Sequence, residues 1–377
     1  MDARPHERPR QGHHGLVSVA PAALVVAAAA LVAAVGGGLL RACPATLPPG
    51  LPGWLVAGAS WHAVLMICGF LGTVVATERA VAVGRAWAWI APLASAAAAA
   101  LLIAGQLVPA RVALLLAAIA FLVVNLWIAR RQPALHTALL AVAAGAWLVG
   151  AALFLAAAGA PLPWWFAFLV LTVAAERLEM TRLLRRARGT PAQLAGVTGA
   201  LLAGATCASL PGAVAVAGTA LFGAALLLLS AWLFAHDIAT RTIRSAGLAR
   251  YMAVCLLAGY AWLALAGIGW IGLAAGRPWR DLALHALGLG FIMSMMMAHA
   301  PAILPALTRL RIRFGVAFYA PVAMLHASLA MRLGLGLDDA RLRGIGAFLD
   351  AIALLAFVAT LAAGVLAGRL ARGDAVR

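Results

Sequence analysis

The sequence contains few charged residues for its length. Of 377 residues only 10% are charged, whereas 65% are hydrophobic, and the mean hydropathy is +1.02. A soluble domain could not enclose so much apolar surface in its core. The composition therefore excludes a soluble globular protein and predicts an all-α, polytopic integral membrane protein.

Lysine is absent, and acidic residues are scarce. All 28 basic residues are arginines, against 11 acidic residues, and the formal net charge is +17. The arginines lie between apolar runs and do not form one basic stripe. This distribution argues against nucleic acid as a partner and indicates the lipid bilayer as the surroundings of the chain.

The motifs of soluble enzymes are also missing. The chain has no P-loop, no HExxH and no GxSxG with partner residues, so soluble-type hydrolase chemistry has no support. Gly267-Ile-Gly269-Trp-Ile-Gly272 has the spacing of a dinucleotide fingerprint, but no strand precedes it. It predicts close helix packing instead. The four cysteines show no CxxC spacing and are interpreted as packing residues.

What the sequence does have is a series of apolar runs long enough to cross a bilayer. They predict about twelve transmembrane helices, near residues 16–40, 54–76, 87–106, 110–129, 135–158, 163–184, 191–209, 212–235, 250–274, 281–307, 316–336 and 345–368. We expect one transmembrane helical bundle over residues 16–370, with tails at residues 1–15 and 371–377.

Arginine density alternates between the loops. Most of the 28 arginines fall in the N-terminal tail, in the C-terminal tail and after every second predicted helix, for example at Arg130, Arg188, Arg244 and Arg313. Because cytoplasmic loops of membrane proteins are enriched in basic residues, both termini are expected in the cytoplasm. The predicted location is the bacterial inner membrane.

Two histidines stand out because they lie inside the apolar run Leu284 to Pro305. His285 and His299 are fourteen residues apart, which places them on one helix face about 21 Å apart along the axis. One nitrogen ligand near each leaflet is typical of a bundle that holds two stacked metal centres such as haems. The alternative is that each imidazole forms a hydrogen bond with a neighbouring helix.

Two further histidines lie at matching depths in other helices. His62 is near the outer end of the second predicted helix, level with His285, and His326 is in the inner half of the eleventh, level with His299. The sequence thus predicts two ligand pairs for haem iron, His62 with His285 and His299 with His326. Either pair could instead be structural.

Three other residues are candidates for supporting roles. Met66 is four residues from His62, and with Met293–Met297 it makes copper a second candidate metal, although such methionines also fill gaps in packing. Asp350 is expected either to orient a ligand imidazole or to cap its helix. Glu176 lies deep in its run, and the charged residues that follow it predict a buried ion-pair cluster or a proton path.

Two helix ends resemble each other. Thr73 to Arg79 and Thr172 to Arg177 both end in a Glu-Arg step. This similarity indicates either a faint internal duplication or ordinary anchoring at the membrane interface.

The chain resembles a known group in its predicted twelve spans, its Trp61-His62 step, His285 and the His299-Ala-Pro301 step. It is similar to the NnrS family of haem-containing membrane proteins linked to nitric oxide response, and more distantly to subunit I of haem-copper oxidases and nitric oxide reductases. That subunit holds a haem between helices 2 and 10, at positions that match His62 and His285. The chain lacks the histidines that build the copper site there.

The resemblance implies one or two b-type haems, and a role in nitric oxide stress or electron transfer with electron-transfer or nitric oxide reductase components as partners. Whether the chain is an enzyme stays open; the expected activity, if any, is haem-dependent oxidoreduction. Two alternatives remain: a secondary transporter that uses Glu176 and Asp350 with histidine proton relays, and a non-catalytic membrane partner that assembles or senses another complex.

Overall fold

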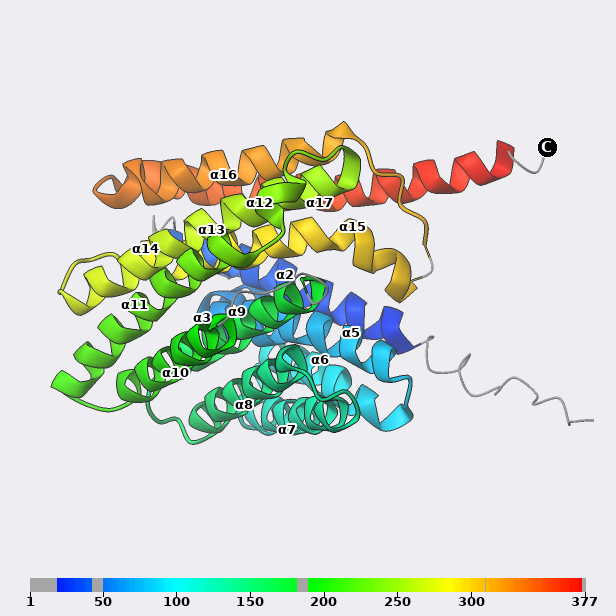
Figure 1. The fold of residues 1–377 in the computed structure, drawn as a ribbon. Coiled ribbons are helices and arrows are strands. Elements are labelled where there is room, and N and C mark those ends of the chain that lie inside the picture. The colour runs from blue at the N-terminus through cyan, green and yellow to red at the C-terminus, as the bar shows by residue number, and fades with distance from the viewer. Residues whose placement is uncertain (1–18, 43–49, 182–188, 309, 375–377) are drawn as a thin grey trace, which may run out of the picture.

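The computed structural model describes residues 19–42, 50–181, 189–308 and 310–374. Within these ranges the chain is helical and contains no strand. The helices lie roughly along one direction and form one elongated bundle (Figure 1). The start of α2 and the end of α17 lie at the same end of it, on the right of Figure 1. The predicted all-α class is confirmed.

Ten helices form most of the bundle. They are α2 (Val19–Ala42), α6 (Ile90–Ile103), α7 (Leu107–Arg131), α8 (Leu135–Leu155), α9 (Pro161–Met180), α10 (Thr190–Ala208), α11 (Ala213–His236), α13 (Gly247–Ala274), α16 (Tyr319–Leu333) and α17 (Ala340–Asp374). Short pieces connect or extend them: η2 (Ala86–Trp89), α12 (Ala239–Thr242), η4 (Val316–Phe318) and η5 (Leu335–Leu337).

Two further rods are composite. The first joins α3 (Gly53–Ser60), α4 (His62–Val64), η1 (Leu65–Gly72) and α5 (Thr73–Val83). The second joins α14 (Arg280–His285), η3 (Ala286–Met293) and α15 (Ser294–Thr308). We call the end of the bundle that holds α3 and α14 the α14 end, and the end where α5 stops the α5 end.

Helices are thus found in each of the twelve predicted runs. In the described part of the chain, ten stretches are long and apolar enough to cross a membrane, and α9 and α10 are not among them. A polytopic membrane protein is therefore supported.

The core lies around α9. Side chains on all faces of this helix are buried, from Trp165 through Leu178, which is typical of a helix enclosed by other helices. It packs against α8 and against both η1 and η3. Elsewhere glycines allow close approach, as predicted for the Gly267 motif: a Cβ on Gly223 would meet the carbonyl oxygen of Gly267 at 2.6 Å.

The two composite rods each contain an eight-residue π-helix, η1 and η3. No other π-helix occurs in the part of the chain that the structure describes. The last four residues of each π-helix are Gly-Phe and two apolar residues, and a hydroxyl residue follows directly. The Thr73 hydroxyl donates to Gly69 O at 2.7 Å, and the Ser294 hydroxyl donates to Gly290 O at 2.6 Å. Because π-helical turns are rare and are found mostly at functional sites, we expect the functional site to involve these two rods.

Candidate functional site

Two histidines from the composite rods meet at the α14 end. His62 begins α4, directly after a break in the helix at Trp61, and His285 ends α14. Their ring centroids are 6.2 Å apart, with 39° between the ring planes. Each histidine lies within three residues of the start of a π-helix. The pair that the sequence placed at one depth is therefore brought close together by two irregular helices.

The hydrogen bonds of His62 and His285 define which ring nitrogen carries the proton. His62 Nδ1 donates to Ala34 O at 2.7 Å, and His285 Nδ1 donates to Asp281 Oδ1 at 2.8 Å. A carbonyl or a carboxylate can only accept, so in each neutral ring Nδ1 bears the proton and Nε2 keeps its lone pair. Metal-binding histidines are commonly held in this way, through the nitrogen that does not bind the metal.

Local sequence explains why both rings are fixed. Asp281 lies in the first turn of α14, where the helix dipole favours an acid, and the spacing of four residues puts it on the same face as His285. His62 lies against a glycine of α2: a Cβ on Gly38 would come within 2.8 Å of His62 Cε1. Any larger residue at position 38 would displace the ring.

Arg332, at the end of α16, joins two carboxylates beside these rings. It binds Asp281 through Nε at 2.9 Å and Nη2 at 2.7 Å, and Asp350 through Nη1 at 3.1 Å. Asp350 also accepts from the Ser328 hydroxyl at 2.5 Å. Arg332 Nη2 is 3.2 Å from both ring nitrogens of His285. We call His62, Asp281, His285, Arg332 and Asp350 the α14 cluster.

The formal charges of the α14 cluster do not cancel. Two carboxylates share one guanidinium, and the two imidazoles are neutral in the tautomers described, so the directly bonded group carries a net charge of about −1. In a surrounding of low dielectric constant such an excess favours a cation. The cluster is therefore suited to a positively charged partner.

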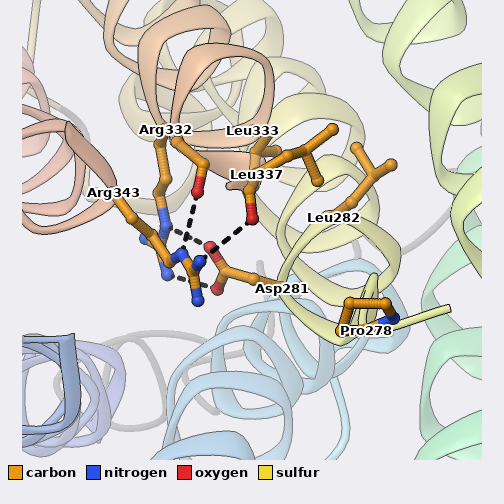
Figure 2. Close-up of a pocket in the computed structure, with 8 residues that line it drawn as sticks. Pro278, Asp281, Leu282, Arg332, Leu333, Leu337 and Arg343 are labelled. Carbon is orange, nitrogen blue, oxygen red and sulfur yellow. Dashed lines mark hydrogen bonds and ion pairs between the residues drawn. The ribbon is translucent and has the colours of Figure 1, made fainter. Parts of the chain in front are cut away.

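A small pocket borders the α14 cluster. Figure 2 shows Asp281 and Arg332 on its wall, with Pro278 and Leu282 beside them. Arg343 of α17 also lines the pocket and donates to Gly336 O at 2.9 Å and to Leu337 O at 3.1 Å. These bonds tie η5, in the turn between α16 and α17, to the start of α17.

A second charged cluster lies toward the α5 end. Arg177 of α9 binds Asp237 through Nε at 2.7 Å and Nη2 at 3.1 Å, and both side chains are almost fully buried. Arg79 of α5 binds Glu176 at 3.0 Å and is 3.9 Å from Glu78. With His299, these residues form what we call the α9 cluster, whose members are Glu78, Arg79, Glu176, Arg177, Asp237 and His299.

Both nitrogens of His299 are occupied in the α9 cluster. Nδ1 donates to Met295 O at 2.7 Å, and Arg177 Nη1 lies 3.4 Å from Nε2. Because a guanidinium can only donate, Nε2 is the acceptor. The lone pair of His299 therefore faces a cation of the protein itself.

His326 has different neighbours. Trp262 Nε1 donates to His326 Nδ1 at 3.0 Å, so in the neutral ring Nε2 carries the proton. His326 Nε2 is buried without a hydrogen-bond partner in the described part of the chain. No hydrogen bond or ring contact joins His299 to His326 among the described residues, so the geometry gives the predicted inner pair no support.

The remaining predicted residues are placed as follows. Asp350 is buried, and its carboxylate contacts Ser328 and Arg332; the carboxylate on the imidazole of His285 belongs to Asp281. Glu176 does lie in an ion-pair cluster, but with Arg79 of another helix. Met66 is half-buried in η1 and packs against the apolar core. Arg182, also expected beside Glu176, lies outside the described residues.

Asp281 and Arg332 were not identified from the sequence. A signal for Asp281 was present in its spacing of four residues from His285. For Arg332 the signal was an arginine inside an apolar run away from the arginine-rich loops. Among the described residues, no group of three or more His, Cys, Asp or Glu side chains is arranged to hold a metal ion.

Comparison with known proteins places the whole bundle in one family. No curated protein and no solved structure matches the chain. One family model, described as a domain of unknown function (DUF8744), matches residues 20–366. That range includes every residue of the α14 and α9 clusters, and the chain therefore belongs to the DUF8744 family.

Proposed function

We propose that this protein is a membrane haem protein, related to the NnrS group, that holds a b-type haem between His62 and His285. The observation that carries the proposal is the pair of neighbouring imidazoles in the α14 cluster, each with Nδ1 bonded to an acceptor, so that Nε2 would be the ligand atom. Electron transfer and nitric oxide stress response are the roles that this assignment and the resemblance favour.

The spacing of the two rings suits a shared metal ion. Two imidazoles that bind one ion with bonds of about 2 Å have their ring centroids no more than roughly 6 Å apart. The observed separation is 6.2 Å. A porphyrin brings four nitrogen ligands of its own and needs only two from the protein, which is the number that His62 and His285 supply. This match favours haem over copper as the bound group.

The protein would contribute orientation and charge, while a bound haem would supply the one-electron chemistry. Asp281 would fix the plane of the His285 ring and increase its basicity. Arg332 would hold Asp281 in place and link it to Asp350. The net negative charge of these three residues would stabilise the more positive, oxidised state of an iron centre.

The transporter alternative has less support. It places Glu176 and Asp350 at one midplane site, but Glu176 is bonded to Arg79 in the α9 cluster and Asp350 to Arg332 in the α14 cluster. The two carboxylates therefore belong to separate groups with separate cations.

The first experiment is an absorption spectrum of the protein purified from haem-replete cells. We expect a Soret band, and loss of a low-spin haem signal in both His62→Ala and His285→Ala, because low-spin haem iron would need a ligand from each of the two histidines. His236→Ala is the matched control: His236 stacks on Trp232 and bonds its own helix, away from the α14 cluster. A purified wild-type protein without haem, or a spectrum unchanged in both variants, would refute the proposal.

We also propose that the bundle crosses the inner membrane twelve times, with both termini in the cytoplasm and the α14 cluster toward the periplasm. The arginine distribution and the common position of the start of α2 and the end of α17 support this orientation (Figure 1). Reporter fusions after Arg188 and Arg313 should then report cytoplasm, and a fusion after Gly276 should report periplasm. A periplasmic signal after Arg188 would contradict the twelve-span topology.

A further inference from the structure

A group of arginine and tryptophan side chains lies at the α5 end, away from both charged clusters. Arg131, the last residue of α7, has its Cζ 4.5 Å from the centroid of the Trp127 ring, and Arg85 has its Cζ 5.9 Å from the same ring. Trp87 of η2 contacts Trp127 edge to face, with centroids 5.9 Å apart. We call these four residues the Trp127 site.

The Trp127 site gathers positive charge around one ring. Arg85 and Arg131 are exposed, and neither forms an ion pair with a carboxylate in the described part of the chain. Cation–π contacts hold both guanidiniums against one indole, where no carboxylate among the described residues neutralises them. Arg130, in the same last turn of α7, adds a third positive charge. An anion between these groups would relieve the repulsion.

The site lies where lipid headgroups are expected. Arg85 lies in the short link between the candidate spans His62–Val83 and Ala86–Ile103, and Arg131 ends the candidate span Leu107–Arg131. Tryptophan rings are enriched at this depth because they are apolar with one polar edge. Beneath them a small core of Ala20, Ala88, Trp89 and Val124 ties together α2, η2 and α7. The Trp127 site is therefore built on packed helices at the boundary between lipid and water.

We propose that the Trp127 site binds the phosphate group of an anionic phospholipid. A planar guanidinium matches two phosphate oxygens with parallel N–H donors, and arginine is the residue best suited to that geometry. Arg85 and Arg131 would bind the phosphate, while Trp87 and Trp127 pack against the glycerol and the first carbons of the acyl chains. Basic pockets at the cytoplasmic ends of membrane helices bind anionic headgroups in this manner.

The test is native mass spectrometry of the detergent-purified protein with phosphatidylglycerol and with phosphatidylcholine. The wild type should retain phosphatidylglycerol in preference to phosphatidylcholine. Arg85→Gln/Arg131→Gln should weaken that retention by roughly 10- to 30-fold, from the loss of two arginine contacts at an anionic headgroup. Arg85→Lys/Arg131→Lys keeps the charge but not the paired donors, and we expect an intermediate loss.

Arg241→Gln/Arg244→Gln is the matched control. It removes the same charge from two exposed arginines in and just after α12, which lie over no indole ring in the described part of the chain. An equal loss in this control would mean that net charge alone attracts the lipid and would overturn the proposal. So would unchanged retention in Arg85→Gln/Arg131→Gln. A third arm adds inorganic phosphate: displacement of the lipid at millimolar phosphate would assign the site to the free ion instead of the headgroup.

Discussion

The α14 cluster and the α9 cluster contain the same kinds of residues and differ in what their histidines face. Each combines carboxylates, arginine and a histidine from the rod of α14, η3 and α15. In both, that histidine uses Nδ1 as a donor, His285 to Asp281 and His299 to Met295 O. A guanidinium nitrogen lies near Nε2 in both, Arg332 Nη2 at 3.2 Å from His285 and Arg177 Nη1 at 3.4 Å from His299. Among the described residues, however, only His285 has a second imidazole beside it, that of His62.

That difference separates a candidate metal site from a structural ion-pair network. A second imidazole can share a metal ion with His285, whereas His299 has no second imidazole beside it in the described part of the chain. Both guanidiniums are bound to carboxylates, Arg332 to Asp281 and Asp350 and Arg177 to Asp237, so the arginines do not distinguish the two sites. The presence of a histidine inside a membrane helix therefore says less about metal binding than the presence of a second ligand beside it.

The two clusters also differ in how they hold the bundle together. Arg177 and Asp237 are nearly fully buried and form a bidentate pair between the core helix α9 and the end of α11. Asp281 and His285 remain partly exposed at the rim of the bundle. We therefore expect substitutions in the α9 cluster to change stability and substitutions in the α14 cluster to change cofactor binding.

The largest predicted effect follows from removing Arg177. Arg177→Met leaves the Asp237 carboxylate buried without its cation, and breaking a buried pair from one side costs about 3–5 kcal/mol. We expect a large fall in the thermal stability of the purified protein, measured by unfolding in detergent. Arg177→Met/Asp237→Asn removes both charges and should recover much of the loss. If the single variant were as stable as the wild type, the α9 cluster would not be a structural network.

The next effect concerns Asp281 and Asp350, which offer a charge-matched comparison. Asp281→Asn and Asp350→Asn each remove one negative charge bonded to Arg332, but only Asp281 contacts His285. We expect Asp281→Asn to weaken haem binding about 10- to 100-fold, as found for groups that orient a ligand histidine. Asp350→Asn should change it by less than about tenfold. Haem titration of the apo variants measures both, and equal effects would show that only net charge matters.

Features set by the local sequence could be predicted, whereas features set by contacts between distant residues could not. The twelve helical runs could be read directly, because apolar runs of bilayer length have few alternatives to helix. The η1 and η3 segments could not, because a π-helix depends on one additional residue in a turn and on neighbours that accommodate it, such as Trp262 against Gly290. The matching depth of His62 and His285 could be read from the sequence, but depth does not make their two rods neighbours, and the pairing of these rods rested on the family resemblance.

The sequence did not predict which arginine pairs with which carboxylate in each cluster. The Glu-Arg steps at Glu78 and Glu176 look alike, and the structure shows that they meet, with Arg79 bound to Glu176. Nothing in either step specifies that the arginine of one pairs with the acid of the other. The choice depends on how α5 and α9 pack, as does the choice of Asp237, sixty residues away, as the partner of Arg177.

The smallest predicted effect concerns the second pair of histidines, His299 and His326, for which the sequence predicts a second haem. His299 Nε2 accepts from Arg177, and His326 Nδ1 accepts from Trp262, so neither ring in this arrangement directs a free lone pair at the other. We expect His299→Ala and His326→Ala to keep the full haem content and the Soret position of the wild type.

His299→Ala should lower stability by about 1 kcal/mol through loss of the contact with Arg177. His326→Ala leaves the Trp262 N–H without its acceptor, and a similar cost is expected. Haem and metal analysis of both variants decides the matter: loss of the same cofactor equivalent in each would establish a shared inner site and would require these two rings to rearrange when it is filled.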